Sequence, residues 1–324
     1  MLRWVNRYDY DAPDNIGEII DIDGVGNQDT YNPCLCYSDG SKILAFRCED
    51  RDSLIEDKNN YHPSIKFAKQ NEIGRWQVAE EIKPFEMLED PLFVSIKDGD
   101  SDLVILGGVR AKHLPTGGFV ADTVFYKGIS LATLERDEPF ATILGIKDER
   151  LKQLPDGRIL LCRRPLDDKG IGHIAIHVLD NLEELITIND VLPRQIFEID
   201  GTHNDDWVGI NNAYILRDKQ GVEWVGLLGH IGCKDENGDK HYAATTYKIK
   251  MDDLLNGQSQ PMAPNIIVTR SSFPDGPKKQ SFLGDVVFPG SFERLDDGKY
   301  RLWAGLSDAR IGIIDLDDPF RLNQ

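Results

Sequence analysis

The strongest constraint on the fold is a glycine-containing turn signal that recurs five times along the 324 residues. Each turn separates two short apolar runs, which is typical of β-hairpins. The turns are SDGS (38–41), KDGD (97–100), PDGR (155–158), KQG (219–221) and DDGK (296–299). Helical periodicity is scarce, and only residues 179–192 look partly helical. The sequence therefore predicts an all-β protein built from repeated hairpins.

The residue that opens the strand before each turn is separated from the turn glycine by a nearly constant number of residues. This spacing is eight residues in the first unit and nine in the other four. The five opening residues are Asn32, Asp90, Asp148, Asn212 and Pro289. A further strand-like run follows each hairpin, such as GRWQVAE (74–80) in the first unit. Radial repetition of four-stranded units is the architecture of a propeller. We predict one five-bladed β-propeller domain over residues 1–324, with a β-sandwich of coincidental spacing as the alternative.

A propeller would bring chemically active side chains together at one end of its axis. The innermost strands run along the axis, so residues at equivalent positions of the repeat meet at one mouth of the central channel. The inner strands would supply Asn32, Asp90, Asp148 and Asn212, the ends of the second strands Arg47, Arg164, His230 and Asp308, and the neighbouring positions Glu49, Lys147 and Arg150. Each residue alone fits a turn, a solvated charge or a buried histidine. Because these residues occupy equivalent positions in the repeat, we favour the interpretation that they form one functional site.

The composition of this set points to sugar or phosphate chemistry. An ordinary glycosidase needs two carboxyl groups, one to protonate the leaving oxygen and one to activate water or attack carbon. A phosphorylase needs only the acid, because phosphate is the nucleophile and the protein binds it with Arg, Lys and His. The predicted set contains one or two carboxylates among cations and amides, so both chemistries stay open.

The net charge argues against two classes of partner. The chain has 37 Lys and Arg against 55 Asp and Glu, a formal charge of −18, and nucleic acids and anionic membranes both require a basic surface. No apolar run is long enough to span a membrane, and we expect a cytoplasmic protein. The five cysteines lie mostly in strand patterns and suggest reduced, buried thiols. We expect no metal site at Cys34 and Cys36, no phosphate loop at GVGNQ (24–28), and a loop over the mouth at THNDDW (202–207).

Several ordered segments resemble the signature segments of a bacterial and trypanosomatid family long known only as a domain of unknown function. The resemblance runs from about residue 30 to the C-terminus. Its segments are YNPCLCYSDGSKILAFRCEDRDS (31–53), EDPLFVSI (89–96), LVILGGVR (103–110), VFYKGISL (124–131), IKDERLKQLPDGRILLCRRP (146–165), WVGINNAYIL (207–216), GLLGHIG (226–232) and DVVFPGSFERLDDGKYRLWAGLSDARIG (285–312). The resemblance implies a five-bladed propeller, and an activity like that of mannosyltransferase/phosphorylases that act on β-1,2-mannan. The motifs are also distantly similar to those of β-mannoside phosphorylases.

The resemblance also implies a role for each residue. Asp90 matches the catalytic aspartate, and Arg150, Arg164 and His230 match phosphate-binding positions. The sugar-contacting positions correspond to Asn32, Arg47, Glu49, Asn212 and Asp308, and we add Asp148 as a substrate-binding candidate. Because Arg163 precedes Arg164, the sequence does not decide which of the two faces the site. PGSF (289–292) replaces an expected Gly-Gly in the fifth unit.

We therefore expect an inverting β-mannoside phosphorylase that forms mannose 1-phosphate, or a mannosyltransferase that uses a sugar nucleotide. No cofactor is expected beyond phosphate as co-substrate. Asp90 would be the general acid, and a neighbouring carboxylate or burial would have to help it keep its proton. One alternative is a hydrolase on the same fold, with Glu49 or Asp148 as the base. Another is a propeller that binds sugars without catalysis. Linkage and chain length depend on loops near 50–62, 112–122 and 200–210.

Overall fold

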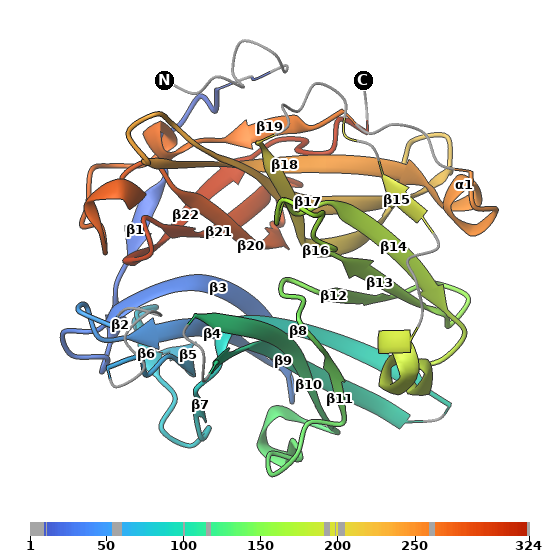
Figure 1. Cartoon of the computed structure of the whole chain (residues 1–324), viewed down its shortest axis with the longest axis horizontal. Helices are drawn as coiled ribbons and strands as arrows, with labels where there is room; N and C mark the ends of the chain where they lie inside the picture. The colour runs from blue at the N-terminus through green and yellow to red at the C-terminus, as the bar shows by residue number, and fades with distance from the viewer. Residues whose placement is uncertain are drawn as a thin grey trace.

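A computed structural model describes residues 10, 12–53, 60–99, 101–114, 118–190, 195–197, 199, 205–258 and 263–322. Five sheets surround a central axis, so the predicted five-bladed β-propeller is confirmed (Figure 1). We number the blades in the order of their inner strands, β3, β8, β12, β16 and β20. All five predicted turn glycines have φ between 59° and 93°, a backbone conformation that glycine adopts without steric cost.

Each blade is a mainly antiparallel sheet whose strands follow one another from the axis outwards. Blade 1 contains β3 (Asp29–Ser38), β4 (Ser41–Glu49), β5 (Ser64–Gln70) and β6 (Trp76–Val78), with β2 (Ile22–Asp23) beside β6 and β7 (Phe85–Glu86) beside β5. Blade 2 contains β8 (Glu89–Asp98), β9 (Ser101–His113), β10 (Phe119–Gly128) and β11 (Ala141–Ile143). Blade 3 contains β12 (Arg150–Gln153), β13 (Ile159–Arg163), β14 (Ile174–Leu179) and β15 (Gln195–Phe197).

Blades 4 and 5 complete the ring. Blade 4 contains β16 (Trp207–Arg217), β17 (Glu223–Lys234), β18 (Lys240–Lys250) and β19 (Asn265–Val268). Blade 5 contains β20 (Val287–Arg294), β21 (Tyr300–Leu306), β22 (Arg310–Leu316) and, as its outermost strand, β1 (Glu18–Ile20). The N-terminal β1 therefore closes the ring on the last blade. Short helices lie between strands at Leu131–Thr133, Leu182–Asp190, Met251–Leu255, Arg270–Ser272 and Ser281–Leu283.

Two details differ from the sequence prediction. The run GRWQVAE supplies β6, the fourth strand of blade 1, whereas the third strand is β5. The closing strand β1 was not predicted, because three residues are too few to show a periodic pattern. The partly helical segment 179–192 contains a 3₁₀ helix over Leu182–Asp190.

The described core fills the spaces between neighbouring blades. Leu44, Phe46 and Trp76 of blade 1 pack with Trp303 and Ile311 of blade 5, and the rings of Trp76 and Trp303 meet edge to face at 5.4 Å. Four further clusters join blades 1 and 2, 2 and 3, 3 and 4, and 4 and 5. The hydrophobic effect thus holds the ring together between blades. No helix in the described ranges is long and apolar enough to cross a membrane.

The inner strands distort where they begin. The strand register shifts between Tyr31 and Cys34, Glu89 and Leu92, Ile210 and Asn212, and Pro289 and Ser291. Asn32 and Asp90 have φ of 47° and 49°, and Asp148, just before β12, has 65°. Asn and Asp tolerate this left-handed backbone better than other side chains do. These bulges release residues from the strand ladder at one end of the axis.

Candidate active site

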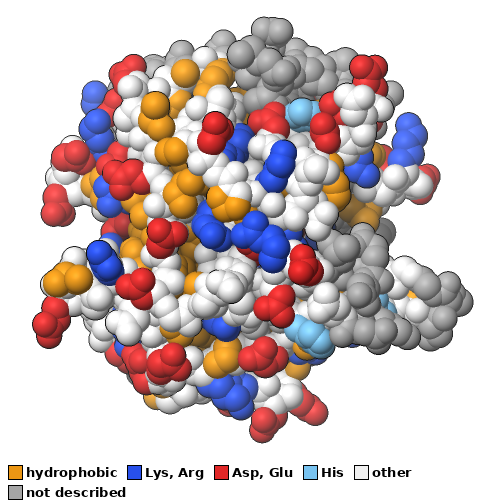
Figure 2. Space-filling model, turned by 90° about the vertical axis from the view of Figure 1, so that its left-hand side faces the viewer, with side chains coloured by type: hydrophobic (Ala, Val, Ile, Leu, Met, Phe, Trp, Pro, Cys, Tyr) orange, Lys and Arg blue, Asp and Glu red, His pale blue; other side chains and the backbone are white. Residues whose placement is uncertain are grey.

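The candidate site lies where the inner strands begin. A narrow cavity of about 10 Å³ there is lined in part by Asn32, Asp90, Arg150 and Asn211. This space holds about one water molecule, so a larger ligand would bind above it. Figure 2 views this end of the molecule and shows Lys and Arg side chains gathered near its middle, with acidic side chains around them.

Asp90 accepts two hydrogen bonds, both at the same carboxylate oxygen. Asn32 Nδ2 donates to Asp90 Oδ1 at 2.7 Å, and Arg47 Nη1 donates to the same atom at 3.2 Å. Within the described part of the chain, no hydrogen bond reaches Oδ2. Gly305 leaves room for Asn32, because a Cβ there would lie 2.2 Å from Asn32 Oδ1. Two donors thus fix the orientation of the carboxyl group through Oδ1.

Arg47 lies at the centre of a cluster of carboxylates. Its guanidinium contacts Glu89 Oε2 at 2.7 Å and Glu49 Oε1 at 3.1 Å, in addition to Asp90. Tyr61 donates to Glu89, and Arg47 Nη2 donates to the Tyr61 hydroxyl at 3.2 Å. Lys279 Nζ pairs with Glu49 Oε1 at 2.5 Å. Sequence reasoning did not identify Glu89, Tyr61 or Lys279, although Glu89 directly precedes Asp90.

Carboxylates outnumber cations in this part of the mouth, which we call the acid side (Glu49, Glu89, Asp90, Asp308, Arg47 and Lys279). Burial raises the pKa of Glu49 to about 7, although Lys279 opposes the shift. Burial also raises the pKa of Glu89, against the effect of Arg47. Asp308 is partly exposed, and desolvation raises its pKa despite Arg47. Glu49, Glu89 and Asp308 therefore keep their protons to a higher pH than ordinary carboxyl groups do.

Arg164 lies on the other side of the mouth, in a space that two glycines keep open. Its Nε donates to Val208 O at 3.0 Å, and its Nη1 contacts Asp148 Oδ2 at 2.8 Å. A Cβ on Gly172 would lie 2.5 Å from Arg164 Nε, and a Cβ on Gly209 would lie 3.1 Å from Arg164 Cδ. The guanidinium therefore requires both glycines to hold its orientation.

Arg163 and Arg164 point to different partners. Arg163 Nε contacts Glu149 Oε2 at 3.2 Å, whereas Arg164 reaches Asp148, the residue at the same phase as Asp90. Glu149 is fully buried, and burial raises its pKa to about 7 although Arg163 opposes the shift. The structure thus places Arg164, and not Arg163, beside the residues predicted at the mouth.

Arg150 and His230 complete this part of the mouth, which we call the anion side (Lys147, Asp148, Arg150, Arg164 and His230). Arg150 Nε donates to Asn211 O at 2.8 Å. His230 Nδ1 lies 2.8 Å from Asn211 Oδ1, and its ring packs against Tyr242 and Phe288. Burial lowers the pKa of His230 to about 3, and Arg164 adds to the effect. His230 is therefore neutral.

The position in blade 4 differs by one residue from the prediction. Asn212 does not line the cavity; its Nδ2 donates to Gly290 O and Ser291 Oγ, both at 3.4 Å. Asn211 is the residue that the bulge turns towards the cavity. It was missed because the spacing of the sequence cannot reveal a one-residue bulge. Lys147 is exposed at the mouth. Residues 202–204 of the THNDDW segment, which was predicted to form a loop over the mouth, lie outside the described residues.

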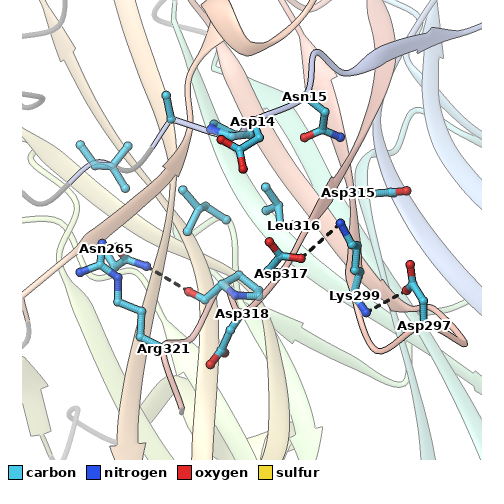
Figure 3. A pocket seen from close by; sticks show the side chains of 15 residues that line it. Asp14, Asn15, Asn265, Asp297, Lys299, Asp315, Leu316, Asp317, Asp318 and Arg321 are labelled. Carbon is cyan, nitrogen blue, oxygen red and sulfur yellow. Dashed lines mark hydrogen bonds and ion pairs between the residues drawn. The ribbon is translucent and has the colours of Figure 1, made fainter. Parts of the chain in front are cut away.

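A second cavity, of about 590 Å³, lies at the outer edge of blades 4 and 5 (Figure 3). Five aspartates line it, and Lys299 is paired with Asp317 at 3.2 Å. This acidic lining does not suit an anionic substrate, and none of the predicted site residues lies there. In the described segments no three His, Cys, Asp or Glu side chains are grouped to hold a metal ion.

Comparison with solved structures finds the same architecture in proteins of known activity. A mannose phosphorylase from Leishmania mexicana, solved with phosphate, has a TM-score of 0.78 and 24% identity, and covers 98% of this chain and 92% of that one. A GDP-Man-dependent mannosyltransferase from the same organism has a TM-score of 0.74 and 24% identity, over 95% and 90% of the two chains. A structure reported for GH130 mannoside phosphorylases and hydrolases has a TM-score of 0.57 and 14% identity, over 89% and 84%.

At these identities the likenesses establish the shared fold. No curated protein matches the sequence. The model of a family described as a protein of unknown function, DUF1861, matches residues 10–322. The match covers nearly the whole chain, and the chain therefore belongs to the DUF1861 family.

Proposed function

We propose that this protein is an inverting β-mannoside phosphorylase that releases mannose 1-phosphate. One observation carries the proposal: one mouth of the propeller brings together Asp90, whose Oδ2 accepts no hydrogen bond from a described residue, and a group of cations around Arg164. This combination matches the needs of phosphorolysis, in which the protein supplies an acid and binds the nucleophile. The phosphate-bound mannose phosphorylase that shares the fold supports it.

In the proposed reaction the leaving sugar and the phosphate lie on opposite faces of the mannose ring. A phosphate oxygen held by Arg150 and Arg164 attacks the anomeric carbon as the bond to the leaving oxygen breaks. Asp90 Oδ2 gives its proton to that oxygen, directly or through a sugar hydroxyl. Asn32 and Arg47 already donate to Oδ1, so they stabilise the carboxylate that forms. Asp90 regains a proton when the sugar phosphate leaves as a dianion.

The carboxylates that could serve a hydrolase are poorly suited to activating water. Glu49 is fully buried and contacts Arg47 and Lys279. Asp148 is only 3% exposed. Burial by itself would raise its pKa, but the cations beside it hold the pKa well below the ordinary value. Asp148 is therefore a weak base. Glu49 has a pKa raised to about 7, but its side chain is fully buried and does not reach water. These contacts favour phosphate over water as the nucleophile.

A mannosyltransferase is the second candidate. The likeness to a GDP-Man-dependent mannosyltransferase favours it, because the same cations would bind the phosphates of a sugar nucleotide. The experiment is to incubate the purified protein with β-mannosides, with and without phosphate, and with a mannose nucleotide and a sugar acceptor. The proposal predicts mannose 1-phosphate only when phosphate is present. Free mannose formed at the same rate without phosphate would contradict it, and no turnover with any donor would indicate a sugar-binding protein.

A further inference from the structure

The anion side contains a carboxylate among its cations. Asp148 Oδ2 accepts a hydrogen bond from Arg164 Nη1 at 2.8 Å. Its other oxygen, Oδ1, lies 4.0 Å from Arg150 Nη2, which is too long for a hydrogen bond. Across the described ranges, no hydrogen bond reaches Oδ1. Oδ1 is not one of the fully buried polar atoms that lack a partner, so it keeps contact with solvent, and water or a ligand can donate a hydrogen bond to it.

Asp148 is suited to accept a hydrogen bond and not to donate one. Burial by itself would raise its pKa, but Lys147, Arg164 and Arg150 together hold the pKa well below the usual value for aspartate. The carboxyl group therefore stays ionised at any pH at which the protein would act. An ionised carboxylate offers only acceptor atoms.

His230 provides a second acceptor in the same place. Its Nδ1 faces Asn211 Oδ1 at 2.8 Å, an arrangement in which Nδ1 carries the proton and donates it to the amide oxygen. Nε2 then has a lone pair. A Cβ on Gly209 would lie 2.6 Å from His230 Cε1 and 3.1 Å from both His230 Nε2 and Arg164 Cδ, so this edge of the ring and the Arg164 side chain both pack over Gly209. Cationic donors nearby favour a lone pair at Nε2 over an N–H group.

We infer that the anion side selects an oxyanion that carries a proton, and that Asp148 is the residue that sets this selectivity. The inference rests on the proposed function. Arg150 and Arg164 bind the unprotonated oxygens of hydrogen phosphate, and its P–OH group donates to Asp148 Oδ1. Sulfate has the same charge and shape but no proton, so one of its oxygens would face the carboxylate with like charge and no hydrogen bond.

The first test uses the wild-type protein and three dianions of similar size. Calorimetry at about pH 8, where phosphate is mainly the hydrogen phosphate dianion, compares phosphate with sulfate and with fluorophosphate, in which fluorine replaces the P–OH group. The inference predicts that phosphate binds about 100-fold more tightly than the other two. Equal affinities would overturn the inference and leave phosphorolysis standing. No binding of phosphate would contradict the proposed phosphorolysis as well.

The second test assigns the selectivity to one side chain. Asp148→Asn keeps the shape of the residue and an oxygen for Arg164, but its amide can donate to an unprotonated oxygen. We expect the phosphate-to-sulfate ratio to fall to within about threefold, mainly because sulfate binds more tightly. Glu149→Gln removes the neighbouring buried carboxylate and should keep the wild-type ratio. A folded Asp148→Asn protein with the wild-type ratio would overturn the assignment, and the wild-type anion series stands if that variant does not fold.

Discussion

Asp90 and Asp148 occupy the same position in neighbouring repeats, yet their surroundings differ in charge. Both have left-handed backbone at the start of an inner strand. Asp90 shares one arginine with Glu89 and lies near Glu49, whereas Asp148 has Lys147, Arg150 and Arg164 near it. On the acid side burial raises the pKa of Glu49 and Glu89, and on the anion side the cations lower that of Asp148.

This contrast shows how a repeated fold produces two functions from one repeat position. The repeat fixes where the carboxyl group lies, and the strands beside it decide its protonation. Arg47 reaches Asp90 from β4 of blade 1, whereas Arg164 follows β13 of blade 3, the blade that Asp148 opens. If the two sides act separately, a substitution on one side should leave the function of the other side unchanged.

The largest effect is expected for Asp90→Asn. The amide keeps the shape of the side chain but cannot give up a proton, so kcat should fall about a thousandfold. Phosphate affinity, measured by calorimetry, should stay within about twofold of wild type because the anion side is unchanged. A variant that keeps a tenth or more of the wild-type kcat would show that Asp90 is not the acid.

Arg164→Lys should have the opposite pattern. An ammonium group cannot reproduce the planar contacts with Val208 O and Asp148, so the KM for phosphate should rise about 100-fold. Binding of the mannoside, measured without phosphate, should not change. Arg163→Lys is the matched control, because the structure directs Arg163 to Glu149. An equal rise in the KM for phosphate in both variants would mean that Arg163 and Arg164 do not have separate roles.

Glu89→Gln should change the pH dependence of turnover. The Glu89 charge is one of the like charges that raise the pKa of Glu49, so without it the acid side loses its proton at lower pH. The alkaline limb of kcat/KM should move to lower pH by about one unit. Phosphate binding at a fixed pH should not follow this shift. An alkaline limb that stays in place or moves to higher pH would show that Glu89 does not help the acid side to keep its proton.

Gly172→Ala should weaken phosphate binding about tenfold, because the added Cβ would lie 2.5 Å from Arg164 Nε and displace the guanidinium. Turnover at saturating phosphate should change less. Gly284→Ala is a suitable control, since a Cβ there meets nothing closer than 3.6 Å. Wild-type phosphate affinity in Gly172→Ala would show that Arg164 does not depend on this contact.

The smallest effect concerns stability. Burial raises the pKa of Glu149 from 4.5 to about 7, so the folded protein binds this proton more tightly than the unfolded chain does. The stabilisation is present below about pH 4.5 and is lost as pH rises towards 7. In Glu149→Gln the free energy of unfolding, measured by urea titration, should decrease less over this range. An unchanged pH dependence would show that Glu149 is ionised throughout.

The fold was largely predictable from the sequence, because the turn glycines mark every blade. The strand β1 was not, since a three-residue strand gains its place only from the neighbouring β22. The position of a residue at the mouth was predictable where the residue follows the repeat, as Asp90 and Asp148 do, whereas their roles stay predictions. Asn211 was missed because a bulge moves the inward position by one residue. Lys279 and Tyr61 come from segments outside the repeat, so no spacing in the sequence connects them to Glu49 or Arg47.

The most direct test of the account is the source of the oxygen that joins the anomeric carbon. Cleavage of a β-mannoside is carried out in ¹⁸O-labelled water with unlabelled phosphate, and the products are examined by mass spectrometry. The account predicts mannose 1-phosphate without ¹⁸O at the anomeric oxygen, because phosphate held on the anion side is the nucleophile. Free mannose with ¹⁸O at that position, formed at a rate independent of phosphate, would show that water attacks and would contradict the account.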